Sequence, residues 1–288
     1  MKIQVAQSAG FCFGVRRAID IALQAARTEQ DVYMLGEIVH NESVVDQIQR
    51  AGIRVVDRID DIPAGVLLFR AHGSTPETYA EAEARGLKIV DATCPMVLEI
   101  HRIVRNLHAE GYQIVIIGDH NHDEVRGIAG QAPGARVVAA PADLEGWDRR
   151  YPKLGVVVQS TQSLGNVQQI LPQLVRFSRE IRFINTICKP TTDHQSEICQ
   201  MPRHNDIMII VGSYTSANTR RLTELSQSIN PRTYQVQTAA DVRAEWFEGV
   251  ETVGISAGAS TPDVLIREVV DAIRRIDPGA EVDGLGDE

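Results

Sequence analysis

Three of the four cysteines in this 288-residue chain occupy the same kind of position. Each follows a short apolar segment that predicts a buried strand, and each is followed closely by a predicted helix. The cysteines are Cys12, Cys94 and Cys188, and the predicted strands cover residues 3–6, 87–90 and 181–184. The separations are similar, with 82 residues between the first two cysteines and 94 between the last two. We therefore expect three segments of like construction to point their thiols at one place.

Four thiols spread through a chain of this length do not indicate a disulfide framework, and such cysteines are structural thiols, metal ligands or nucleophiles. The repeated placement of three of them at strand ends favours metal ligands. Structural zinc ligands usually occur in close pairs such as C-x2-C, and the sequence has no such pair. Iron–sulfur clusters are held by thiolates that need not be adjacent. The pattern therefore favours a cluster over zinc, although three cysteines and a histidine could also hold zinc. Cys199 lies in a predicted helix, residues 191–200, roughly 16 Å along the axis from Cys188. We interpret Cys199 as a thiol on that helix and not as a ligand.

Polar side chains follow most of the other predicted strands. Imidazoles, hydroxyls and an amide, combined with helix N-termini, suit the binding of a phosphate or diphosphate. The candidates are His40, His72, His122, Ser160, Thr161, Ser216, Asn218 and Ser260. Glu124 lies two residues after His122, where a carboxyl group in a closed pocket could donate a proton. The sequence has neither a nucleotide P-loop nor a G-x-G-x-x-G motif after a strand, so we expect no bound NAD(P) or flavin and an external electron carrier.

Helix and strand patterns alternate along the whole chain, which predicts an α/β fold with mostly parallel sheets. Each third supplies one cysteine loop and two further polar loops at strand ends, which is an internal threefold repeat. Ligands of open α/β sheets bind outside the carboxyl ends of the strands, so three such ends would enclose one pocket. We expect α/β domains at residues 14–94, at 95–186, and at 187–278 together with 1–13, whose strand would complete the last sheet. Residues 118–125 are expected to form a loop, and the acidic tail, residues 279–288, to be disordered.

Composition narrows the range of partners. The formal net charge of −9 disfavours a nucleic acid or an anionic membrane surface. No apolar run of about 18 residues occurs, and the first residues show no signal-peptide pattern. We therefore expect a cytoplasmic protein that acts on a small molecule.

Seven short motifs occur in order along nearly the whole chain. They are Gly10-Phe-Cys-Phe-Gly-Val, Val39-His-Asn, Ala71-His-Gly, Asp91-Ala-Thr-Cys-Pro, Asn121-His-x-Glu-Val, Asn185-Thr-Ile-Cys and Ser256-Ala-Gly-Ala-Ser-Thr-Pro-Asp. Together they resemble the motifs of the 4-hydroxy-3-methylbut-2-enyl diphosphate reductases, which end the methylerythritol phosphate route to isoprenoids. The resemblance implies a trefoil of three α/β domains, related by a pseudo-threefold axis, around a central [4Fe–4S] cluster.

The resemblance also implies the roles of residues. Cys12, Cys94 and Cys188 would hold the cluster, and the substrate hydroxyl would bind its open iron. The hydroxyl would leave as water after two electrons and two protons arrive, giving isopentenyl and dimethylallyl diphosphate. Glu124 would feed protons toward that hydroxyl, with Ser160 as a relay partner that also contacts substrate. The diphosphate would be held by His40, His72, His122, Ser216, Asn218 and Ser260. A ferredoxin or flavodoxin is the expected electron donor.

Several positions depart from the family pattern. Ser160 stands where threonine is general, and Ala217 where serine or glycine is frequent. Asp123 replaces the proline of a His-Pro-Glu motif, which would loosen a loop that proline stiffens. His194 stands where arginine is common and Pro190 where alanine is common. None of these changes removes an expected cluster ligand or the expected proton donor.

Two other functions are compatible with the residues. A cluster-dependent hydratase or dehydratase would use iron only as a Lewis acid and would work without a reductant. A zinc-stabilised phosphate-binding module would contain zinc but no sulfide, and it would catalyse nothing.

Overall fold

The computed structural model describes residues 1–284, which divide into two compact units. The single-sheet unit contains Met1–Val15, His40–Val44 and the chain from Lys189 onward. The two-sheet unit contains Arg16–Val39 and Val45–Cys188. None of the helices described combines the length and the apolar character needed to cross a bilayer. All strand pairs in the described part of the chain are parallel.

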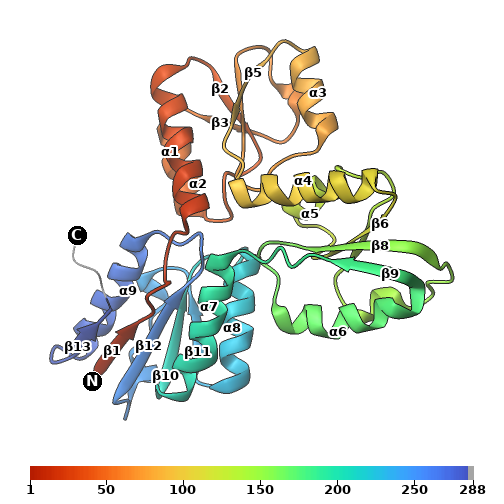
Figure 1. Ribbon diagram of the computed structural model, residues 1–288. Coiled ribbons are helices and arrows are strands. Elements are labelled where there is room, and N and C mark those ends of the chain that lie inside the picture. Colours follow the sequence, from red (N-terminus) through yellow and green to blue (C-terminus); the bar gives the residue numbers. More distant parts are fainter. Residues whose placement is uncertain (285–288) are drawn as a thin grey trace. The chain divides into compact units, whose positions relative to one another are not determined.

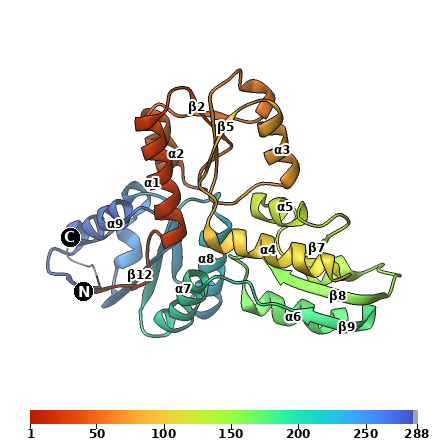
Figure 2. The same ribbon diagram turned by 45° about the horizontal axis from the view of Figure 1, so that its top comes forward.

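The first sheet of the two-sheet unit has the order β3-β2-β4-β5. Its strands are β2 (Val32–Leu35), β3 (Arg54–Val56), β4 (Val66–Phe69) and β5 (Lys88–Asp91). The helices beside it are α1 (Phe13–Thr28) and α2 (Glu42–Arg50) on one side and α3 (Pro76–Ala84) on the other (Figures 1 and 2). All four residues of β4 are buried, which explains its wholly apolar sequence. Thr75 caps α3 and Pro76 opens it.

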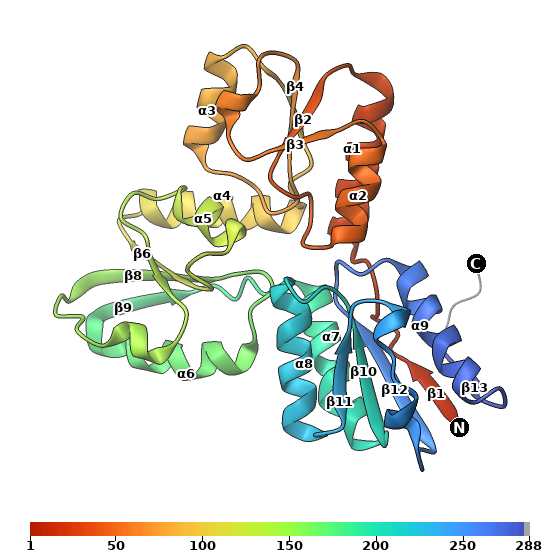
Figure 3. The same cartoon turned by 180° about the vertical axis from the view of Figure 1, so that it is seen from behind.

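The second sheet of this unit has the order β7-β6-β8-β9. Its strands are β6 (Gln113–Ile117), β7 (Arg136–Val138), β8 (Tyr151–Val158) and β9 (Ser178–Phe183). On one face, α4 (Pro95–Ala109) and α5 (Asp123–Ala129) pack through apolar residues that include Ile100 and Val125. On the opposite face, α6 (Leu164–Leu174) packs through Val167 and Ile170 (Figure 3).

The single-sheet unit has five strands in the order β11-β10-β12-β1-β13. They are β1 (Lys2–Val5), β10 (Ile207–Val211), β11 (Thr233–Val236), β12 (Thr252–Ala257) and β13 (Glu281–Asp283). Ile207 and Ile209 of β10 face α9 (Asp263–Ile276). Met208 and Ile210 face α7 (Lys189–Gln200) and α8 (Ala217–Ile229) on the other side (Figure 3). The side chains of β10 therefore alternate between two apolar layers.

One strand order is repeated in all three sheets. The series β3-β2-β4-β5 corresponds to β7-β6-β8-β9 and to β11-β10-β12-β1. The last strand of each series leads to a cysteine, since β5 precedes Cys94, β9 precedes Cys188 and β1 precedes Cys12. The predicted α/β fold of repeated parallel sheets is confirmed. The prediction that the N-terminal strand completes the last sheet is also confirmed, because β1 pairs with β12.

Two predictions are wrong. Residues 118–125 do not form one loop, because α5 begins at Asp123 with His122 as its N-cap. The acidic tail is not disordered throughout, because Glu281–Asp283 pairs with β1 as β13, which gives backbone groups on that edge of β1 their hydrogen-bond partners. The rest of that prediction concerns residues 285–288, which lie outside the described part of the chain. The short strands β3 and β11 were not predicted, since three or four residues give little periodic signal.

Candidate functional site

In the two-sheet unit, the loop after β4 holds His72 beside the Cys94 loop. The Cys94 N–H donates to the Ala71 carbonyl over 3.0 Å, which ties the two loops together. Gly73 follows His72 with a φ of +75°, and a Cβ at this position would lie 2.9 Å from the His101 ring. Glycine tolerates both the dihedral angle and the close approach. The turn therefore fixes the direction in which the chain continues after His72.

A hydrogen-bond network fixes the segment between β5 and Cys94. Asp91 accepts from the Tyr79 hydroxyl and from the Thr93 N–H, each over 2.8 Å. Arg17 donates to the Thr93 carbonyl over 3.1 Å. Burial raises the pKa of Tyr79 above its ordinary value, so the phenol stays protonated and continues to donate. Both backbone groups of Thr93, its N–H and its carbonyl, are therefore hydrogen-bonded. Cys94, the N-cap residue of α4, follows directly after this fixed residue.

The first turn of α5 carries His122 and Glu124. Nδ1 of His122 accepts from the Glu124 N–H over 3.2 Å, so the histidine side chain caps the helix. The rings of His72 and His122 meet edge to face, with centroids 5.4 Å apart and an interplanar angle of 83°. Two of the predicted diphosphate-binding imidazoles therefore lie together. Figure 2 shows α5 beside α4 within this unit.

Glu124 and Ser160 form a buried pair. The carboxyl group of Glu124, a residue only 2% exposed, accepts from the Ser160 N–H over 2.6 Å and from the Ser160 hydroxyl over 2.8 Å. The Ser160 carbonyl in turn accepts from the Cys188 N–H over 3.0 Å. Ser160 therefore joins the candidate acid to the third cysteine loop.

Gln159 is a site residue that the sequence reasoning missed. It is fully buried, its Oε1 accepts from the Asp119 N–H over 2.9 Å, and its Nε2 donates to the Thr161 hydroxyl over 3.0 Å. These bonds join the loop after β6 to the loop after β8. A glutamine at the end of an otherwise apolar strand is the only local signal of this role. Thr161, a predicted candidate, takes part in this contact.

In the single-sheet unit, the Cys12 loop is held at both ends. The Cys12 N–H donates to the Ala259 carbonyl over 3.1 Å. At the start of the loop, the carboxylate of Glu197 accepts from the N–H groups of Gln7 and Ser8, each over 3.0 Å, and from the Ser8 hydroxyl. The loop is therefore anchored to α7 and to the segment after β12.

His194, one of the departures from the family pattern, supports the same loop. It lies on α7, is 2% exposed and is hydrogen-bonded to the Ser8 backbone. Burial lowers the pKa of His194, against opposing effects of that hydrogen bond and of Glu197 and Asp193, so the imidazole is neutral. Cys199 also lies on α7, so the prediction of a helix at this cysteine is confirmed.

The N-terminus of α8 carries Ser216 and Asn218. The Ser216 hydroxyl accepts from the Thr219 N–H over 3.3 Å and caps the helix. Asn218 is 8% exposed, and within residues 1–284 its Nδ2 has no hydrogen-bond partner. An unpaired buried donor costs about 1–3 kcal/mol, which a bound anionic oxygen would offset. Ala217 adds only its backbone N–H, and this helix end therefore suits an anion.

The segment that bears His40 contacts the same unit at two points. The Ser260 hydroxyl donates to the His40 carbonyl over 3.4 Å. Glu42, which the sequence reasoning did not single out, accepts from the hydroxyls of Ser213 over 2.9 Å and Thr215 over 3.3 Å. His40, Ser260 and the loop before α8 are therefore parts of one hydrogen-bonded assembly.

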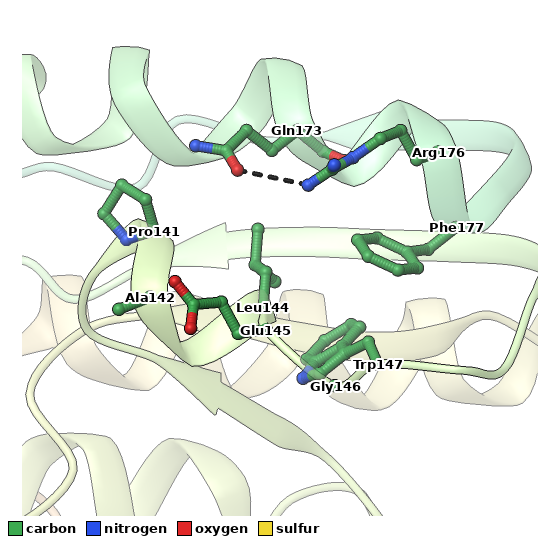
Figure 4. A pocket seen from close by; sticks show the side chains of 9 residues that line it. All are labelled: Pro141, Ala142, Leu144, Glu145, Gly146, Trp147, Gln173, Arg176 and Phe177. Carbon is green, nitrogen blue, oxygen red and sulfur yellow. Dashed lines mark hydrogen bonds between the residues drawn. The ribbon is translucent and has the colours of Figure 1, made fainter.

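A separate cavity of about 500 Å³ in the two-sheet unit includes none of the predicted site residues. Trp147 and Phe177 flank one end of it, and Gln173 and Arg176, joined by a hydrogen bond of 3.2 Å, lie along one wall (Figure 4). The predicted site residues lie instead on strand-end loops and helix starts.

The chain was compared with known proteins. The family model described as LytB protein matches residues 3–274. A 4-hydroxy-3-methylbut-2-enyl diphosphate reductase of Geobacter metallireducens is 42% identical over 277 residues, which is 96% of this chain and 98% of the relative. The reductase of Syntrophotalea carbinolica is 43% identical over 275 residues, 95% of this chain and 98% of the relative.

Two solved structures are also similar. One, described as the terminal enzyme of the non-mevalonate pathway, is 37% identical with a TM-score of 0.71, and the match covers 96% of this chain and all of that one. The reductase of Plasmodium falciparum is 28% identical with a TM-score of 0.91, covering 100% of this chain and 93% of that one.

Fold and comparisons together define the class, an α/β oxidoreductase built on three parallel sheets. The chain belongs to the LytB family, the 4-hydroxy-3-methylbut-2-enyl diphosphate reductases. Members of this family are generally iron–sulfur dependent. The reductase prediction is confirmed at this level, and the hydratase and zinc-module alternatives are not supported.

Proposed function

We propose that this protein reduces 4-hydroxy-3-methylbut-2-enyl diphosphate to isopentenyl and dimethylallyl diphosphate, using a [4Fe–4S] cluster held by Cys12, Cys94 and Cys188. The observation that carries the proposal is the buried Glu124–Ser160 pair, whose serine carbonyl accepts from the Cys188 N–H. An acid candidate joined to a cysteine loop through Ser160 suits proton delivery next to a metal group.

The donor set fits a cluster with three protein ligands. All three cysteines are half-buried, and each follows the equivalent strand of its sheet. The N–H of each donates to a carbonyl of a neighbouring loop, at Ala259, Ala71 or Ser160, which fixes the backbone of the ligand. When bound, the cluster would supply electrons and a Lewis-acidic iron for the allylic hydroxyl.

The diphosphate would bind through imidazoles and through the start of α8. His72 and His122 form one pair of candidate donors. A second group is formed by Ser216, by the first N–H groups of α8, and by Nδ2 of Asn218, which has no hydrogen-bond partner among residues 1–284. His40 and Ser260 complete the proposed set. Imidazole N–H, amide and hydroxyl donors together match the many acceptor oxygens of a diphosphate.

Glu124 would deliver a proton to the leaving hydroxyl. Its burial keeps bulk water away from the carboxyl group, and the Ser160 hydroxyl holds that group in one orientation. A hydroxyl both donates and accepts hydrogen bonds, so Ser160 can pass a proton onward. General acid catalysis of this kind typically contributes a factor of about 10²–10⁴.

The proposal extends to organisation and supply of electrons. We expect three domains at residues 14–94, 95–186, and 187–278 with 1–13. A ferredoxin or flavodoxin would provide electrons, and the protein would work in the cytoplasm.

The test is anaerobic turnover of the hydroxymethylbutenyl diphosphate by the purified protein with and without a low-potential reductant. We expect product only with the reductant. Glu124→Gln should keep the cluster and bind substrate but lose most turnover, whereas Glu145→Gln, the same change at an exposed glutamate of the same unit, should turn over normally. Unchanged turnover in Glu124→Gln would remove the acid role, and product formation without any reductant would point to a hydratase.

A further inference from the structure

A buried ion pair joins the loop after β4 to the first turn of α5. Nη1 of Arg70 lies 2.8 Å from Oδ2 of Asp123, and the two side chains are only 16% and 14% exposed. Arg70 precedes His72 by two residues, and Asp123 lies between His122 and Glu124 in the chain. The pair therefore connects the two short segments that carry three of the proposed site residues.

Gly36 leaves room for the guanidinium group of Arg70. Gly36, at the end of β2, has a φ of +71°, and a Cβ there would lie 2.4 Å from Nη1 of Arg70. Arg126, whose side chain is 66% exposed, also pairs with Asp123 from the solvent side. Burial lowers the pKa of Arg70, while the charge of Asp123 acts in the opposite direction. The carboxylate of Asp123 is thus the main group that offsets the cost of burying the charged guanidinium of Arg70.

We propose that the Arg70–Asp123 pair is a positioning clamp, which sets the distance between the two proposed diphosphate-binding histidines and the orientation of the α5 start. The expected effect on diphosphate binding rests on the proposed function, whereas the geometry of the ion pair does not depend on that function. Separating the two segments would leave a buried charge without its partner, which is strongly unfavourable. The edge-to-face contact of His72 and His122, at 5.4 Å between centroids, is the arrangement that the clamp preserves.

The clamp also gives a physical reason for the residue at position 123. Proline, which the family pattern has here, begins a helix through its own fixed φ. His122 has extended dihedrals (φ −78°, ψ 135°), which a following proline favours, so the backbone would accept either residue. Asp123 therefore does not loosen this segment, because it sits in the first helical turn and is tied to Arg70.

The experiment is a double-mutant cycle on the cluster-loaded protein. Arg70→Met, Asp123→Asn and the double variant are compared for Kd of isopentenyl diphosphate, KM, kcat, and iron and sulfide content. Each single variant should weaken binding by about tenfold or more with unchanged cluster content, and the double variant should be weakened by much less than the product of the two effects. Arg126→Gln, which removes only the exposed partner of Asp123, is the control and should bind as the wild type does.

Asp123→Pro removes the ion pair with Arg70 but keeps a residue that suits the start of α5. It therefore replaces Asp123→Asn in the experiment if that variant does not fold. We expect weak binding in Asp123→Pro alone and recovery when Arg70→Met is added, because the unpaired guanidinium is then gone. Additive effects in the cycle, or wild-type binding by Asp123→Pro alone, would overturn the clamp. A wild-type protein that neither binds nor reduces the diphosphate would instead refute the proposed function. In that case the clamp is tested by the unfolding free energies of the same variants and by the His72 and His122 ring signals in NMR spectra. Non-additive free energies with shifted ring signals support the clamp, and additive free energies with unshifted signals overturn it.

Discussion

Replacing Ser160 with alanine removes the hydroxyl that donates to Glu124 over 2.8 Å, while the 2.6 Å bond from the Ser160 N–H stays in place. Both residues are at most 6% exposed, so water does not readily replace the lost donor. Proton delivery would leave Glu124 as a carboxylate, and a hydrogen bond to a charged group contributes about 1.5–3 kcal/mol. If that free energy is lost wholly in the transition state, turnover falls by roughly 10- to 150-fold.

Stability should fall as well, by a separate amount, because the bond also exists in the folded protein without substrate. Only the further part of its free energy, gained on reaching the transition state, lowers turnover. For a protein of this size, a loss of 1.5–3 kcal/mol lowers the midpoint of thermal unfolding by roughly 3–12 °C. The assay is anaerobic turnover together with thermal unfolding followed by circular dichroism. Cluster content is measured in parallel, so that a lost cluster is not mistaken for a lost proton relay.

Ser160→Thr is the matched variant, because it keeps a hydroxyl on the same carbon and adds one methyl group. We expect near wild-type turnover from Ser160→Thr and strongly reduced turnover from Ser160→Ala at equal cluster content. The reasoning is refuted if Ser160→Ala turns over like the wild type, or if both variants lose turnover equally.

Two further predictions concern other parts of the chain. Glu197→Gln weakens the hydrogen bonds that hold the backbone before Cys12, so it should lower the free energy of unfolding by about 1–2 kcal/mol. It should also speed the loss of iron to a chelator. Glu268→Gln, at an exposed glutamate, is the control, and equal rates of iron loss in the two variants would contradict this role of Glu197. His101 is 4% exposed, and burial lowers its pKa from 6.5 to about 4. The unfolded chain therefore binds more protons between these values, and the protein should lose about 3 kcal/mol of stability as pH falls through this window. Urea unfolding of His101→Phe should show a flatter pH dependence, and an unchanged slope would rule out His101 as its source.

The sequence predicted the fold and the cysteine loops well because their signals are local. Each cysteine stands directly after an apolar strand, and motifs such as Thr75-Pro76 or Cys94-Pro95 mark helix starts through the chemistry of single residues. The alternation of strands and helices then allows few sheet topologies, because two parallel strands must be joined by a crossover connection, which is usually a helix. Repeated strand order in three sheets follows from the same repeated pattern.

The parts that the sequence did not predict depend on distant contacts or on short polar elements. The Glu197–Ser8 contact joins residues 189 positions apart, and no local pattern marks it. The start of α5 reads as a loop because its residues are polar, although the His122 side chain caps a helix there. The edge strand β13 contains acidic residues that suggest disorder, and only the free edge of β1 gives it a partner. The Glu124–Ser160 pair was expected only from family resemblance, since nothing in either segment indicates the other.

The most direct test of the cluster assignment is iron and sulfide content in anaerobically purified wild type and in four cysteine-to-serine variants. The proposed ligand set predicts about four iron and four sulfide per chain in the wild type. Cys12→Ser, Cys94→Ser and Cys188→Ser should each lose most of both, and Cys199→Ser should match the wild type. Zinc without sulfide in the wild type, or a full iron and sulfide complement in any of the first three variants, would contradict it.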